Sequence, residues 1–146
     1  GGYGTKGKGY DGKGGEIYGE ETLLKQIYFG SGGGSTNDIF GGNGGGIIEL
    51  IIEQQLINHG LIRSNGGEGL YVVGGGSGGS ILIELKCQSQ FYPDILEQTL
   101  GTITCIGGNQ NQTNEGGKGR IAIYGIELSP DNILKINPKP FNRFHK

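Results

Sequence analysis

The side chains that most often carry out chemistry are few in this 146-residue chain, and they form no recognisable catalytic pattern. The two histidines are His59 and His145, and no serine or cysteine nucleophile stands in a recognisable setting beside His59. Triad members meet in space and not in sequence, so spacing alone leaves a triad open. A histidine in the turn before Gly60 is the simpler interpretation. The sequence therefore predicts no catalytic residue and no enzyme.

Acidic side chains also lack the spacing that catalysis or metal binding requires. Glu49, Glu53 and Glu84 could be proposed as paired carboxylates for glycoside hydrolysis. On the strand register described below they occupy an outward face, where charges normally lie. Asp38 and Glu68 stand beside glycines, but the alternating oxygen ligands of a calcium loop are missing. The sequence predicts no metal and no cofactor.

The overall charge argues against a nucleic-acid partner. Lysine and arginine number 12 against 14 aspartate and glutamate, whereas nucleic-acid binders normally show a basic stripe. The glycine tract 30–36 superficially resembles a phosphate-binding loop, but it lacks the lysine and the following helix. No run of about 20 apolar residues is present, so no membrane span is expected. The chain starts at Gly1 and contains no methionine, which we interpret as a processed product or a piece of a longer polypeptide.

Glycine dominates the composition, with 34 residues, while apolar residues make up only 33%. Such a composition is typical of low complexity, but here the apolar residues cluster into runs of strand length. Glycine is expected where a Cβ would not fit: in close-packed layers, in tight corners and in polyproline-II-like segments. The length of the chain fits one domain.

The strongest signal is internal repetition. The segment GIIELIIE at 46–53 aligns with GSILIELK at 79–86, an offset of 33, and GRIAIY at 119–124 aligns with the second copy at an offset of 40. A shorter phrase, GLIRSNGG at 60–67, recurs as GTITCIGG at 101–108. Recurrence at such distances is the signature of repeat architectures. Alternation and β-branched residues favour strands, although 47–57 could alternatively form an amphipathic helix.

Stacking of these units would bury an apolar face that no single unit can bury alone. The predicted rows are Ile48/Ile81/Ile121, then Leu50/Ile83/Ile123, then Ile62/Ile103, with Ile52 and Leu85 on the same face. We therefore predict an all-β fold, a glycine-rich parallel β-helix or solenoid-like stack of short strands with glycine-rich, polyproline-II-like corners. This domain would span residues 1–128, and 129–146 would form a proline-containing basic C-terminal arm.

The phrases GGGSGGSILIEL, GTITCIGG and GGKGRIAIYG resemble a class of glycine-rich β-helix-like repeat proteins of protists, plants and bacteria. Their repeats have the form GGGSGGSI-x-I, GTI-x-x-x-GG and GGxGRIAIY, and the likeness covers residues 1 to about 125. The resemblance implies a secreted or surface-associated structural module and brings no catalytic residues. It does not extend to the insert QSQFYPDILEQTL or to the C-terminal arm.

Three modifications or contacts follow as further expectations. Cys87 and Cys105 both fall on the inward face, where they would form a disulfide in the oxidising compartment that the resemblance implies, or else remain buried thiols. Asn111 begins the glycosylation acceptor pattern Asn-Gln-Thr, and the amides around it could instead bind a sugar or simply be solvated. The arm would wrap its own domain or reach a neighbouring subunit through Phe141 and Phe144.

These observations favour a non-enzymatic structural protein, a self-assembling subunit of an extracellular or cell-surface filament. Its partners would be copies of itself, because an open stack of strands exposes unpaired edges at its ends. The alternative is a carbohydrate-binding adhesin or receptor-binding tip module, which would read glycans with exposed Tyr, Asn and Gln side chains.

Overall fold

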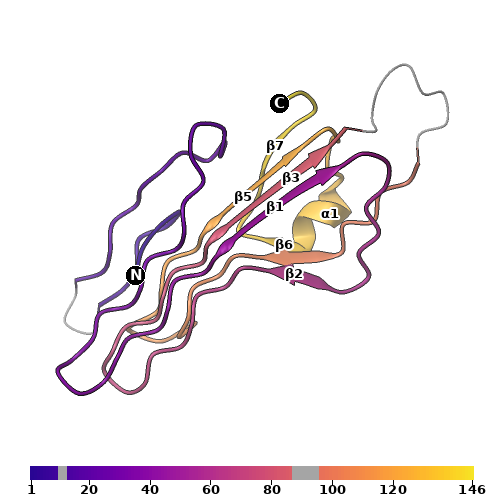
Figure 1. The fold of residues 1–146 in the computed structure, drawn as a ribbon. Coiled ribbons are helices and arrows are strands. Elements are labelled where there is room, and N and C mark those ends of the chain that lie inside the picture. The colour runs from indigo at the N-terminus through magenta and orange to yellow at the C-terminus, as the bar shows by residue number, and fades with distance from the viewer. Residues whose placement is uncertain (10–12, 87–95) are drawn as a thin grey trace.

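One half of the molecule consists of parallel strands in two sheets. The computed structural model describes residues 1–9, 13–86 and 96–146 (Figure 1). One sheet has four strands in the order β1-β3-β5-β7 and the other has three in the order β2-β4-β6. Their bounds are β1 Ile47–Ile52, β2 Leu61–Arg63, β3 Ser80–Leu85, β4 Thr102–Thr104, β5 Arg120–Tyr124, β6 Ile136–Asn137 and β7 Phe141–Arg143. A five-residue helix, α1 (Pro130–Leu134), lies between β5 and β6.

The strand pairing follows the offsets read from the sequence. Ile48 of β1 lies opposite Ile81 of β3, which lies opposite Ile121 of β5. The next inward row is Leu50, Ile83 and Ile123, and in the smaller sheet Ile62 lies opposite Ile103. These predicted pairings are confirmed, and β1 is a strand rather than the alternative helix.

The main core lies between the two sheets. Ile81, Ile83 and Ile103 have no exposed surface, and Cys105 is buried with them. Every one of the ten residues expected to stack belongs to this cluster or packs against it. The alternation of strand side chains thus directs one isoleucine face of each sheet into a shared interior.

The predicted all-β solenoid is nevertheless wrong. The strands divide between two separate parallel sheets, a helix precedes β6, and the described residues form no closed solenoid. The repeat offsets determine which strands lie side by side, but they carry no information on the path that joins the long strands to the short ones. Nor are the glycine tracts corners: Figure 1 shows them running on beyond the sheets as extended segments that turn far from β1.

Helix α1 replaces the first part of a strand that the alternation in 132–137 predicts. Ser129 caps the helix by accepting a hydrogen bond from the backbone N–H of Asn132, whose side chain in turn bonds the Ser129 backbone. Pro130 occupies the first turn, where its missing N–H costs nothing. This local capping box outweighs the alternation, and only Ile136–Asn137 becomes a strand.

The extended glycine tracts are held together by backbone hydrogen bonds at every third residue. Gly42 and Gly45 donate to the carbonyls of Gly74 and Ser77, and the next pair of tracts repeats the pattern through Gly78 and Gly117. A period of three is that of polyproline-II, which makes no internal hydrogen bonds and so must satisfy its backbone with neighbours. We call the half of the molecule that these extended glycine tracts form, beyond the two sheets, the glycine bundle.

Close approach explains why these positions are glycine. A Cβ on Gly76 would overlap the carbonyl oxygen of Asn43 in the neighbouring tract. The same added atom on Gly34 would meet nothing within 4 Å. The requirement for glycine is therefore local to the contacts between tracts.

The N-terminal segment covers the outer face of the larger sheet. Leu23 packs on Leu82, Ala122 and Tyr124 in a second buried cluster. The hydroxyls of Tyr3 and Ser80 are 2.7 Å apart, and the Tyr3 ring stacks on Tyr18 with a 4.6 Å centroid separation. Residues 1–29 thus complete the fold although the described part of the segment contains no strand.

We expect Gly76→Ala to destabilise the protein by about 3 kcal/mol or more, because the new methyl group overlaps backbone that cannot move aside independently. The matched variant Gly34→Ala should leave stability within about 0.5 kcal/mol. Chemical denaturation of both variants measures this. Equal stability of the two would contradict the packing assigned to the bundle.

Candidate functional site at the open end of the sheets

Strands β1 and β2 are the outermost strands of their sheets at the same end of the stack. Each has a strand neighbour on one side only, β3 and β4 respectively. We call β1, β2 and their connection 53–60 the open end (Figure 1). Its outer edge carries backbone N–H and C=O groups without a strand partner among the described residues, the arrangement that accepts an additional strand.

Burial falls sharply at this end. Ile81 and Ile83 have no exposed surface, whereas the equivalent Ile48 and Leu50 of β1 are only half-buried. Apolar side chains with about half their surface exposed line the rim, namely Ile51 (51%), Ile57 (58%) and Leu61 (49%). The open end thus continues the core, and no layer formed by the described residues covers it.

The connection between β1 and β2 is fixed rather than loose. The side chain of Gln55 donates to the carbonyl of Glu97 at 2.7 Å, and the Leu56 N–H donates to the side chain of Gln98 at 2.6 Å. The Asn58 amide donates to the carbonyl of Leu100 at 2.8 Å. These bonds to the next unit hold the open end in one geometry before any partner arrives.

The opposite end of the stack is covered by the C-terminal arm. β7 pairs with β5 and β6 with β4, so residues 129–146 join both sheets of their own domain. The amide of Asn142 donates to the carbonyls of Ile123 and Ile126. Pro138 and Pro140 lie between β6 and β7, and proline is a common device that blunts a strand edge.

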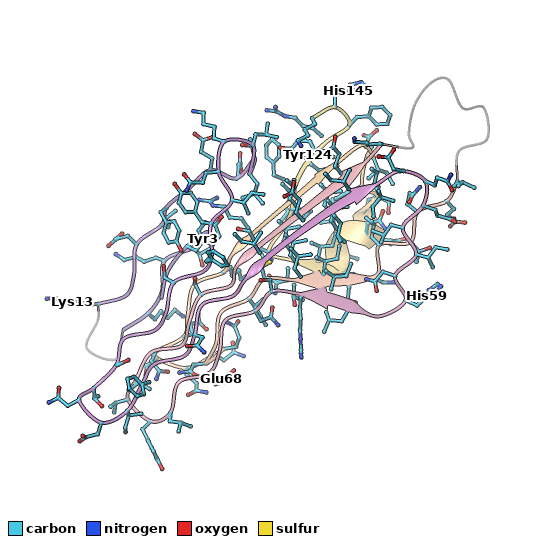
Figure 2. All side chains as sticks on the ribbon, viewed as in Figure 1. Tyr3, Lys13, His59, Glu68, Tyr124 and His145 are labelled. Carbon is cyan, nitrogen blue, oxygen red and sulfur yellow. The ribbon has the colours of Figure 1, made fainter. Side chains whose placement is uncertain are left out.

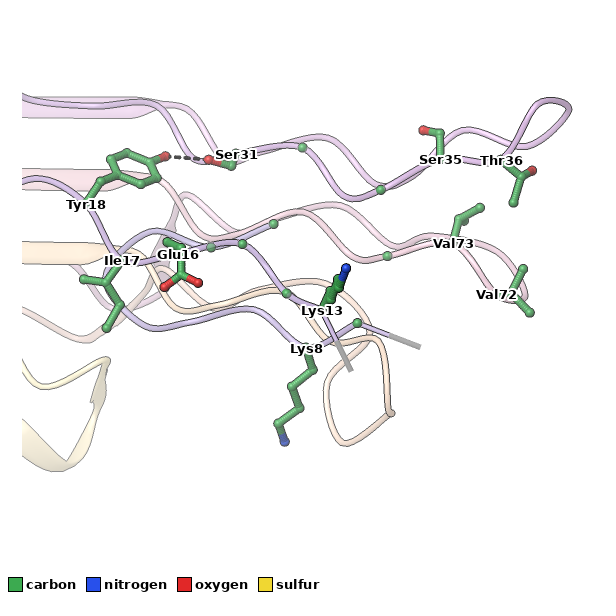
Figure 3. A pocket seen from close by; sticks show the side chains of 18 residues that line it. Lys8, Lys13, Glu16, Ile17, Tyr18, Ser31, Ser35, Thr36, Val72 and Val73 are labelled. Carbon is green, nitrogen blue, oxygen red and sulfur yellow. Dashed lines mark hydrogen bonds between the residues drawn. The ribbon is translucent and has the colours of Figure 1, made fainter. Parts of the chain in front are cut away.

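A groove of about 600 Å³ crosses the glycine bundle (Figure 3). Eight of its 18 lining residues are glycines, and the Ser31 hydroxyl donates to the Tyr18 hydroxyl at 2.9 Å. Lys8 and Glu16 stand at the groove, but each already pairs elsewhere, with Glu115 at 3.0 Å and with Lys6 at 3.4 Å. Lys8 lowers the pKa of the Glu115 carboxyl, as does a hydrogen bond from the Asn111 N–H. Among the described residues that line the groove, no nucleophile is paired with a base.

The chemically reactive side chains that the structure describes do not lie close together. Figure 2 shows His59 beside the β1–β2 connection and His145 near the C-terminus, well apart. Among the described residues, no three His, Cys, Asp or Glu side chains lie close enough together to hold a metal ion. Every buried side-chain nitrogen or oxygen of this part of the chain has a hydrogen-bond partner.

The residues proposed for modification or contact are placed separately. Cys105 lies in the core, while Cys87 lies outside the described residues, so their pairing stays a prediction. Asn111 is exposed, with a left-handed backbone (φ 64°). Phe141 packs on Tyr124 with a centroid separation of 6.1 Å, and Phe144 is 46% exposed against His145.

Sequence reasoning missed an exposed turn at the tip of the bundle. Leu70 (65%) and Tyr71 (84%) are exposed there, and Tyr71 has φ 54°. The buried side chain of Asn114 donates to the carbonyls of Tyr71 and Val73, and buried Asn109 accepts from the Gly69 N–H. The signal that could have found this turn was the position of an aromatic residue between two glycine tracts, flanked by apolar residues.

We expect the Cys105 thiol to resist alkylation in the folded protein, because burial raises its pKa to about 12 and blocks access. Iodoacetamide labelling at mildly alkaline pH, followed by mass spectrometry in a Cys87→Ser background, measures this. Labelling should appear only on unfolding. Rapid modification of the native protein would contradict the burial of this side chain.

No protein-family model, curated protein or solved structure matches this chain. Within the described ranges, no helix has the length and apolar character needed to cross a membrane. The resemblance to glycine-rich β-helix-like proteins thus rests on the sequence phrases alone and stays a prediction.

Proposed function

We propose that this chain is a structural protein that acts by assembling with copies of itself. The observation that supports this most is the open end, where the isoleucine rows of the core continue into half-buried side chains beside an unpaired strand edge. Exposed edges of this kind are normally blunted in monomeric proteins. Here the opposite end has prolines and a covering arm, whereas the open end has no proline and, among the described residues, no covering arm.

The rest of the architecture suits a mechanical role. Parallel ladders and the glycine bundle tie segments far apart in the chain, as in the bond from Gly117 to the carbonyl of Gly1. Such cross-connection by many backbone hydrogen bonds resists local opening. An extracellular or cell-surface setting, and growth into a filament, are finer parts of the proposal. A filament needs a second contact surface besides the open end.

The tip turn supports a second candidate, a binding module. Tyr71 is presented on a turn whose backbone is held by the buried Asn114 side chain, and preorganised aromatic residues make effective contacts. Exposed amides at Asn111 and Gln112 follow in the next loop of the bundle. A tip of this composition could bind a glycan or another protein.

Sedimentation of the purified chain over a wide concentration range tests the first candidate. We expect the mean mass to rise with concentration, and electron microscopy of the heavier species distinguishes discrete particles from filaments. A chain that stays monomeric at all concentrations, yet binds defined sugars on a glycan array, would refute self-assembly and favour the binding module. Loss of sugar binding in Tyr71→Ala would then locate the site at the tip.

A further inference from the structure

We infer that the open end is covered by the open end of a second copy, with the two β1 strands antiparallel around Leu50. This inference rests on the proposed self-assembly and names its contact surface. It joins the two larger sheets into one continuous sheet across a two-fold axis.

Neither packing within its own chain nor backbone conformation requires a glycine at Gly46, just before β1. Its equivalents one and two units later are Gly79 and Gly119, and a Cβ on either would overlap the carbonyl of the preceding tract. A Cβ on Gly46 would meet nothing within 4 Å, its backbone is not left-handed, and the residue is exposed. The space that a preceding tract fills in later units thus holds no described atom here, and a chain docking at the open end would use it.

The copy's own open end is the partner surface best suited to this edge. The far edge of the larger sheet is the three-residue strand β7, which Pro138 and Pro140 precede. The third glycine tract is covered by the N-terminal segment, because Thr5 and Lys8 donate to the carbonyls of Lys118 and Glu115. A contact between like ends is isologous and closes at two copies.

The register follows from the alternation of β1. In an antiparallel pair, residues that lie opposite each other point to the same face of the sheet. When the two strands are identical, the two-fold axis must therefore pass between the two copies of one residue, which lie opposite each other. Centring the pair on Leu50 places Ile48 opposite Ile52 of the copy and extends the apolar face of the core. Centring it on Glu49 would place two carboxylates directly opposite, which is destabilising. The Leu50 register instead sets Glu49 opposite Ile51 of the copy.

Introducing and then reversing a charge repulsion between Glu49 of one copy and position 51 of the other tests both the contact surface and the register. Ile51→Glu places a carboxylate opposite Glu49 of the copy at two symmetric positions, and we expect the dimer dissociation constant to rise at least about tenfold. Adding Glu49→Lys to that variant sets opposite charges face to face, and most of the affinity should return. Sedimentation equilibrium measures the three dissociation constants at low and high salt.

The cycle has internal controls. Ile51 lies beside Glu84 of its own β3, so repulsion between Glu84 and the carboxylate introduced at position 51 is present in both variants. Glu49→Lys also changes the charge within the monomer, so the thermal unfolding of each variant is measured beside its dissociation constant. Leu134→Glu introduces the same charge on α1 at a side chain that is 84% exposed, and it should leave association unchanged. Weakening by Leu134→Glu equal to that by Ile51→Glu, or no rescue by Glu49→Lys, would overturn the inference.

Gly46→Val tests the free space independently. The monomer should keep its thermal stability because an added Cβ has no described atom of its own chain within 4 Å, while the dimer weakens. Gly34→Val is the matched control at a second exposed glycine with open space, and it should leave the dimer intact. A wild-type chain that never associates would refute the proposed function. Association that all of these variants leave unchanged would refute only the open end as its surface.

Discussion

Backbone packed directly against backbone is the constraint on which the rest of this structure depends. In the glycine bundle, tracts approach so closely that carbonyl oxygens of one occupy the Cβ positions of the next, as at Gly76 and Asn43. Polyproline-II-like chains have no internal hydrogen bonds, so each tract is satisfied only by its neighbours. The bundle therefore sets the spacing of the tracts, and the tracts deliver β1, β3 and β5 to the sheet in register.

That dependence also explains where the molecule is complete and where it is not. Interior units have a neighbour on both sides, and their isoleucines at 81 and 83 are fully buried. At one end the two terminal segments supply the missing neighbour, through β7 and through Thr5 and Lys8. At the other end nothing among the described residues does so. In a repeat structure each unit is stabilised by its neighbours, so the unit at that end presents the same apolar face and strand edge as an interior unit.

The sequence carried the local rules of the fold and lacked its connectivity. The alignment of 46–53, 79–86 and 119–124 correctly predicts which strands pair and which faces are apolar. Side-chain alternation and repetition can both be read directly from the amino-acid sequence. It does not contain the route between a long and a short strand, and so the solenoid was wrong. The helix after Ser129 was missed because a capping box competes with alternation over only a few residues.

The candidate site shows the same division. That an edge would be exposed follows from repetition, but which edge stays open depends on where the termini fold, which no periodicity reveals. Gly46 makes the point most clearly, since in sequence it is one of three equivalent glycines. Only the structure shows that a Cβ at Gly79 or Gly119 would overlap the backbone of their own chain, whereas a Cβ at Gly46 would not. A residue that keeps the character of a contact position without a contact is a stronger indication of a partner than exposed apolar surface alone, because scattered surface leucines and isoleucines are ordinary in monomers.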